Sequence, residues 1–179
     1  MSTIRFVLFI TLFFNLLSCR PVPSTERAKG LIAEANNLLE EDVRVADKWA
    51  WEYGRLFTPQ NREQFPSNRE SLRSSGESLM RLLDESSRLN AEAAEKFEQA
   101  AGLVSADKEK KGLTLFATSI RKTIEINSLM KDQMLLASDG EIKDQKIFNE
   151  KFMSLMSLIQ QKSREKDDQL TDGKKLMGW

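Results

Sequence analysis

The chain has 179 residues, of which 40% are apolar and 30% are charged, and its 27 basic side chains are balanced by 27 acidic ones. This is enough apolar material for one domain with a core. A net charge of zero gives no indication of a nucleic-acid partner, which would need a basic surplus. The chain has no histidine, the commonest general base, metal ligand and haem ligand. With only eight glycines and four prolines, a loop-rich or all-β fold is disfavoured.

The chain begins with a short apolar segment. Phe6–Leu17 is a nearly continuous hydrophobic run that follows a single basic side chain, Arg5. The run is shorter than the ~20 residues that a helix needs to cross a bilayer. It therefore predicts the hydrophobic region of a secretory signal peptide, which we place at residues 1–18.

The apolar run ends in Leu16-Leu17-Ser18-Cys19, which resembles the lipobox of bacterial lipoproteins. The only cysteine of the chain stands where the lipobox requires a thiol, and a small residue precedes it. The resemblance implies that signal peptidase II cleaves before Cys19, that the thiol carries a diacylglycerol and that the new amino group is acylated. No other cofactor is expected. An ordinary signal peptide with an incidental cysteine is the alternative interpretation.

The predicted lipids would hold the protein on a membrane, because more than one lipid signal makes anchoring stable. Arg20 stands where the enterobacterial sorting pattern has an aspartate for retention in the inner membrane. This implies the outer membrane if the source is Gram-negative. The tether, residues 19–24, is short and stiffened by two prolines. We therefore expect the folded domain, residues 25–179, to begin close to the lipid headgroups.

Four long segments beyond the tether have apolar residues at the period of an amphipathic helix. We expect helices over Thr25–Phe57, Asn68–Ala101, Asp107–Ala137 and Glu141–Leu170. Matched lengths and short connections favour an all-α fold, an antiparallel up-down-up-down four-helix bundle. Two helical hairpins from separate chains would produce the same pattern.

The residues at the ends of these segments predict how the helices begin and stop. Thr58 and Pro59 predict an N-cap and the first residue of a short helical turn. Ser67–Glu70 and Ser138–Glu141 both have the spacing of a capping box, and Gly102 is an expected stop. Beyond Ile159 the last apolar stripe becomes polar, so we expect weak packing there.

If the first two helices meet at a loop near residues 60–65, Trp49 lies opposite Gly76. A large ring beside a residue without a side chain is a favourable packing pair. We therefore expect the bundle to be closely packed at this level.

Five polar residues interrupt the apolar stripes, namely Asp42, Ser86, Asn90, Thr123 and Asn127. We expect them to bond one another or the backbone in a buried polar layer that fixes the helix register. The alternative is that they line a small polar pocket, as in the extracytoplasmic four-helix sensor domains.

The segment Trp49–Tyr53 is the most distinctive part of the domain. Trp49 and Tyr53 share one helix face, and Trp51 points elsewhere. An exposed tryptophan is a candidate anchor for a protein partner. Alternatively, Phe65 and the connection around it cover Trp51, or Trp51 stacks on Arg55. Trp51 and Phe65 are therefore the candidate interaction residues.

No pattern indicates an enzyme. The chain lacks a glycine-rich phosphate loop, a Gly-x-Ser-x-Gly elbow and the Glu-x-x-His of di-metal bundles. Its consecutive Glu40, Glu41 and Asp42 diverge around a helix, so we expect no metal site. The leading hypothesis is a non-catalytic envelope lipoprotein that acts as a structural or protein-interaction module, with another envelope protein as its partner. The alternative is a small-ligand sensor.

Overall fold

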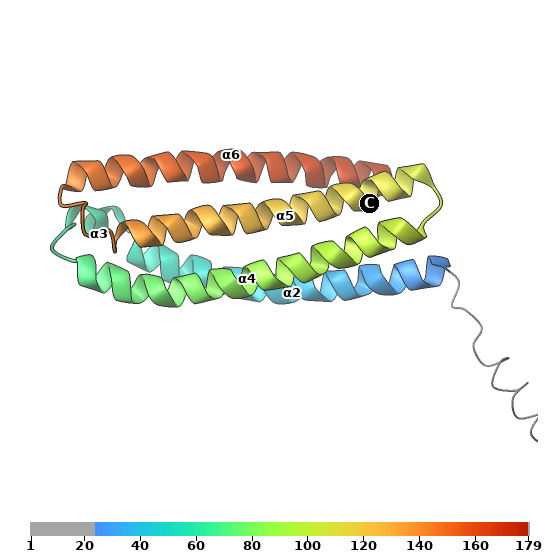
Figure 1. Ribbon diagram of the computed structural model, residues 1–179, viewed down its shortest axis with the longest axis horizontal. Helices are drawn as coiled ribbons and strands as arrows, with labels where there is room; N and C mark the ends of the chain where they lie inside the picture. The colour runs from blue at the N-terminus through green and yellow to red at the C-terminus, as the bar shows by residue number, and fades with distance from the viewer. Residues whose placement is uncertain (1–23, 179) are drawn as a thin grey trace, which may run out of the picture.

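The computed structural model describes residues 24–178, and all regular structure among them is helical. Four long helices lie side by side, and a short helix joins the first to the second (Figure 1). They are α2 (Ser24–Leu56), α3 (Pro59–Glu63), α4 (Arg69–Leu103), α5 (Asp107–Leu136) and α6 (Gln145–Met177). The all-α prediction is confirmed. The predicted signal peptide, Cys19 and the tether up to residue 23 lie outside the described residues.

The helices pack in chain order. α2 lies along α4, α4 along α5, and α5 along α6 (Figure 1). The backbones of α2 and α6 have no comparable contact. Thus α4 and α5 form the central pair, and each outer helix depends on one of them for its position. None of the helices within residues 24–178 is both long and apolar enough to span a bilayer.

The core consists of two apolar clusters. One lies toward the start of α2, where alanines such as Ala28 and Ala35 pack with Phe97 and Phe116. The other lies toward α3 and is aromatic: its members include Phe57, Phe65, Phe148 and Phe152. Its rings stack, with centroids 4.2 Å apart for Phe65–Phe148 and 5.5 Å apart for Phe57–Phe152. Each such buried side chain stabilises the fold by about 1.5–3 kcal/mol.

The predicted signals at α3 are confirmed, and those at both ends of α4 are wrong. Thr58 is the N-cap of α3, and its Oγ1 accepts a hydrogen bond from the Asn61 backbone N–H at 3.1 Å. Ser67 makes no cap, because its hydroxyl donates to the Gln64 carbonyl instead. Gly102 is no stop either, since α4 continues through it to Leu103.

The start of α6 also differs from the predicted Glu141. The N-cap is Asp144, whose Oδ1 accepts from the backbone N–H groups of Lys146 and Ile147 at 2.7 and 3.1 Å. The predicted capping box is a turn in which Asp139 accepts from the Glu141 N–H. Burial of Ile142 in the aromatic cluster holds this segment as a connection rather than as helix.

The expectation that the last helix ends at Leu170 is wrong, whereas packing beyond Ile159 is sparse, since Gly173 is the only buried residue among residues 160–178. α6 continues to Met177, and Gly173 is buried against α5. A Cβ at Gly173 would lie 3.3 Å from the Gly112 carbonyl oxygen. The two facing glycines thus let α5 and α6 approach closely, and the side chains of Phe116 and Met177 pack beside them. An apolar stripe cannot reveal such a contact.

The predicted pairing of Trp49 with Gly76 is wrong. Gly76 faces α5, where a Cβ would lie 3.5 Å from the Cβ of Met134. Trp49 packs instead against the aromatic cluster, and a Lys96–Glu34 ion pair joins α4 to α2 farther along. The helical turn α3 lengthens the connection and so shifts the register away from that of a simple loop.

We predict that Gly173→Leu destabilises the protein by about 1–3 kcal/mol through overpacking against α5. The matched control is Gly30→Leu, because a Cβ at Gly30 would have no atom within 4 Å. That variant should gain up to ~1 kcal/mol from the better helix propensity of leucine. Urea denaturation followed by circular dichroism measures both. Equal midpoints for the two variants would contradict the glycine contact.

Candidate functional site

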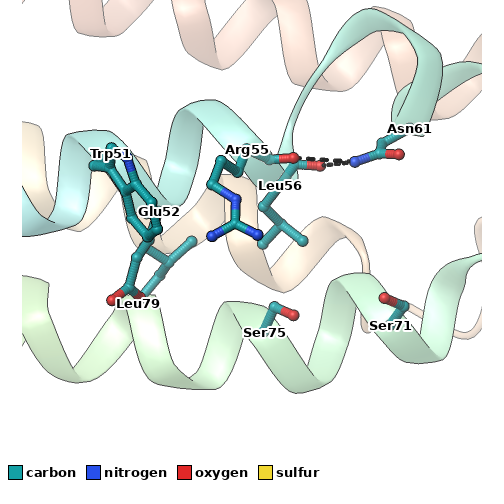
Figure 2. A pocket seen from close by; sticks show the side chains of 8 residues that line it. All are labelled: Trp51, Glu52, Arg55, Leu56, Asn61, Ser71, Ser75 and Leu79. Carbon is teal, nitrogen blue, oxygen red and sulfur yellow. Dashed lines mark hydrogen bonds between the residues drawn. The ribbon is translucent and has the colours of Figure 1, made fainter.

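An open groove lies between α2 and α4, next to the exposed ring of Trp51 (Figure 2). Trp51 is 64% exposed, the highest value among the large hydrophobic side chains of residues 24–178. The groove has a volume of about 370 Å³. Its lining combines an indole, a guanidinium, a carboxylate, an amide, two hydroxyls and two leucine side chains. The lining residues are Trp51, Glu52, Arg55, Leu56, Asn61, Ser71, Ser75 and Leu79.

The position of Trp51 on the surface is supported by Arg55, one turn along α2. The guanidinium carbon of Arg55 lies 4.6 Å from the centroid of the indole ring. This is a cation–π contact, which is worth ~0.5–1 kcal/mol at an exposed site. The stacking on Arg55 was one of the arrangements expected from the sequence, and the structure shows it together with an exposed ring.

Phe65 does not cover Trp51. It is only 2% exposed and stacks on Phe148 in the aromatic cluster. The structure therefore places one of the two candidate interaction residues on the surface and the other in the core. Only Trp51 remains as a candidate contact for a partner.

The end of the groove is closed by α3. The Asn61 side-chain amide donates to the carbonyls of Arg55 and Leu56 at 3.2 and 2.8 Å (Figure 2). These bonds satisfy two of the carbonyls that the last turn of α2 leaves open. They also fix α3 against α2 at this end of the groove.

The structure brings together three of the five predicted polar-layer residues, and all three are buried. The Asn127 amide donates to the hydroxyls of Ser86 at 3.0 Å and Ser87 at 3.2 Å. The Asn90 amide donates to the Ser86 carbonyl at 2.8 Å. These bonds occupy amide donors that a ligand pocket would otherwise offer, and they link α4 to α5.

The other two predicted polar-layer residues, Asp42 and Thr123, are half-buried and make no hydrogen bond to this group. One oxygen of Asp42, Oδ1, is buried without a hydrogen-bond partner. The buried polar layer is thus built by α4 and α5, and α2 contributes no hydrogen bond to it.

A second buried polar contact was missed by the sequence analysis. The Tyr53 hydroxyl donates to Oε1 of Gln133 at 3.2 Å, and the Gln133 amide donates to the Phe152 carbonyl at 3.3 Å. These bonds join α2, α5 and α6. Burial raises the pKa of Tyr53 to about 12, against a smaller lowering by Arg62. In the sequence, Gln133 lies at helical spacing between Met130 and Ala137 of the apolar stripe. This spacing was the signal from which its burial could have been predicted.

The part of the chain that the structure describes shows no candidate metal site. Among residues 24–178, no three Asp, Glu, His or Cys side chains gather in a way that could hold a metal ion.

No family model, no curated protein and no solved structure matches the chain.

Proposed function

We propose that the protein is a lipid-anchored lipoprotein of the bacterial envelope whose helical domain presents the Trp51 groove to another envelope protein. The observation that carries this proposal is the position of the only cysteine, at the end of Leu16-Leu17-Ser18-Cys19. Cleavage there leaves Cys19 as the first residue, and the thiol and amino group carry the lipids. In a Gram-negative source the outer membrane is the proposed site.

The arrangement of the helices supports a spacer role for the domain. The five-residue step from Cys19 to Ser24 reaches at most ~17 Å when fully extended. The start of α2 therefore stays near the membrane. α2 is unbroken from Ser24 to Leu56, and at 1.5 Å per residue Trp51 lies ~40 Å farther along it. In this proposal the four long helices act as one up-down-up-down bundle that separates the groove from the lipid.

The chemistry of the groove supports a protein partner. An exposed tryptophan is a common anchor in protein interfaces, and Arg55 beside it offers donors to a carboxylate. The mixed polar lining suits a polypeptide surface better than an apolar small molecule, for which ligand sites are mostly apolar. We therefore propose a non-catalytic role.

We predict that Cys19→Ala abolishes palmitate labelling and leaves an unprocessed precursor, because the acceptor thiol is gone. Ser18→Ala is the matched control, since alanine keeps a small residue before the cysteine and should be labelled and cleaved normally. Metabolic labelling followed by gel electrophoresis reads out both steps. A Cys19→Ala chain that is still labelled would remove the lipoprotein assignment.

We predict that Trp51→Ala changes the free energy of unfolding by no more than ~1 kcal/mol, because the ring is mostly exposed and loses only its contact with Arg55. It should nevertheless abolish the adduct that a photo-crosslinking residue at Ser75 forms in native membranes. The control is Val43→Ala, which removes another exposed apolar side chain from α2. A Ser75 adduct that survives Trp51→Ala would argue against the groove as the docking site.

A further inference from the structure

One end of the domain brings together three segments that are far apart in the sequence. The start of α2, the connection between α4 and α5, and the end of α6 meet there (Figure 1). Ala28, Ala101, Leu113 and Met177 belong to the alanine-containing cluster that holds them together. Of the described residues, this end lies nearest in the chain to Cys19.

This end, defined as residues 24–31, 105–112 and 171–178, has an excess of positive charge. It contains seven basic and four acidic residues, although the whole chain is neutral. The basic residues are Arg27, Lys29, Lys108, Lys110, Lys111, Lys174 and Lys175, and the acidic ones are Glu26, Asp107, Glu109 and Asp172. The opposite end, residues 52–72 and 136–147, has five basic and six acidic residues. The two ends therefore differ in charge.

Most of this positive charge is not neutralised by ion pairs. Within residues 24–178, Lys29 pairs with Glu26 at 3.1 Å and Lys175 with Asp172 at 3.6 Å. The three lysines at the start of α5 and Lys174 are exposed and make no ion pair there.

The position of one of these lysines, Lys108, is unfavourable for the helix that carries it. Lys108, Lys110 and Lys111 lie in the first two turns of α5. The N-terminal end of a helix bears a partial positive charge, so cations there destabilise it. Helix stability thus gives no reason for Lys108, whereas all three lysines suit a negatively charged surface outside the protein.

We infer that this basic end docks on anionic lipid headgroups. The inference rests on the proposed function, because the lipids on Cys19 would hold this end within ~17 Å of the bilayer. Each lysine near an anionic surface strengthens binding about fivefold. Docking through this end directs the helices away from the bilayer, so the Trp51 groove faces partners ~40 Å above the headgroups.

The test uses the lipidated protein in vesicles. Because Cys19 is consumed by acylation, Ser105→Cys supplies a unique thiol in the connection between α4 and α5 for a fluorescent donor. Energy transfer to an acceptor lipid reports how close this end lies to the bilayer. Vesicles of phosphatidylcholine alone are compared with an equal mixture of phosphatidylcholine and phosphatidylglycerol.

Two matched triple variants separate the basic end from the overall charge. One changes Lys108, Lys110 and Lys111 to Glu, which the N-terminal end of α5 should tolerate because it favours anions. The control changes Lys143 and Lys146 at the opposite end, and Lys151 one turn beyond it, to Glu, and all three lysines are exposed. Both variants lower the net charge equally.

We expect energy transfer to be stronger with the anionic vesicles than with phosphatidylcholine alone. The first triple variant should lose this increase, and the control should retain it. Raising the salt from ~0.1 to ~1 M should also abolish it, as the screening length falls from ~10 to ~3 Å. Equal transfer with both kinds of vesicle, for a protein that floats with them, overturns this inference alone. A protein that does not float with the vesicles overturns the lipoprotein assignment, and the inference with it.

Discussion

The register between α4 and α5 is the constraint on which the rest of the domain depends. α2 packs along α4 and α6 along α5, so the two outer helices are positioned through the central pair. Their side chains still meet near α3, where Phe57 stacks on Phe152 and the Tyr53 hydroxyl reaches the Met156 sulfur at 3.8 Å. A slip between α4 and α5 would separate these contacts. The Asn127 amide, bonded to Ser86 and Ser87, opposes such a slip in the middle of the pair.

A polar layer suits this purpose because a hydrogen bond depends on the alignment of its donor and acceptor far more than an apolar contact does. Leaving a buried donor unsatisfied costs ~1–3 kcal/mol, whereas apolar side chains at helical spacing accept several registers. The two apolar clusters supply the bulk of the stability, and the Ser86–Asn127 contact selects one alignment between them. The fixed alignment keeps the basic end and the Trp51 groove at opposite ends of a single body.

The sequence was sufficient to predict features that repeat along the chain or that interrupt such a repeat. The apolar period located four long helices, and the polar interruptions located Ser86, Asn90 and Asn127. The Gly112–Gly173 approach could not be predicted, because glycine adds nothing to an apolar stripe and its role appears only when two helices meet. Trp49 was misplaced because the register across α3 depends on the helical turn that α3 forms. The burial of Phe65 likewise depends on Phe148, which lies far away in the chain.

A double-mutant cycle on Ser86→Ala and Asn127→Ala tests the register constraint most directly. The contact is a buried hydrogen bond at 3.0 Å between the two central helices. We predict a coupling energy of ~1 kcal/mol between the two substitutions in urea denaturation. Effects that add to within ~0.3 kcal/mol would contradict the account, because the two residues would then act independently.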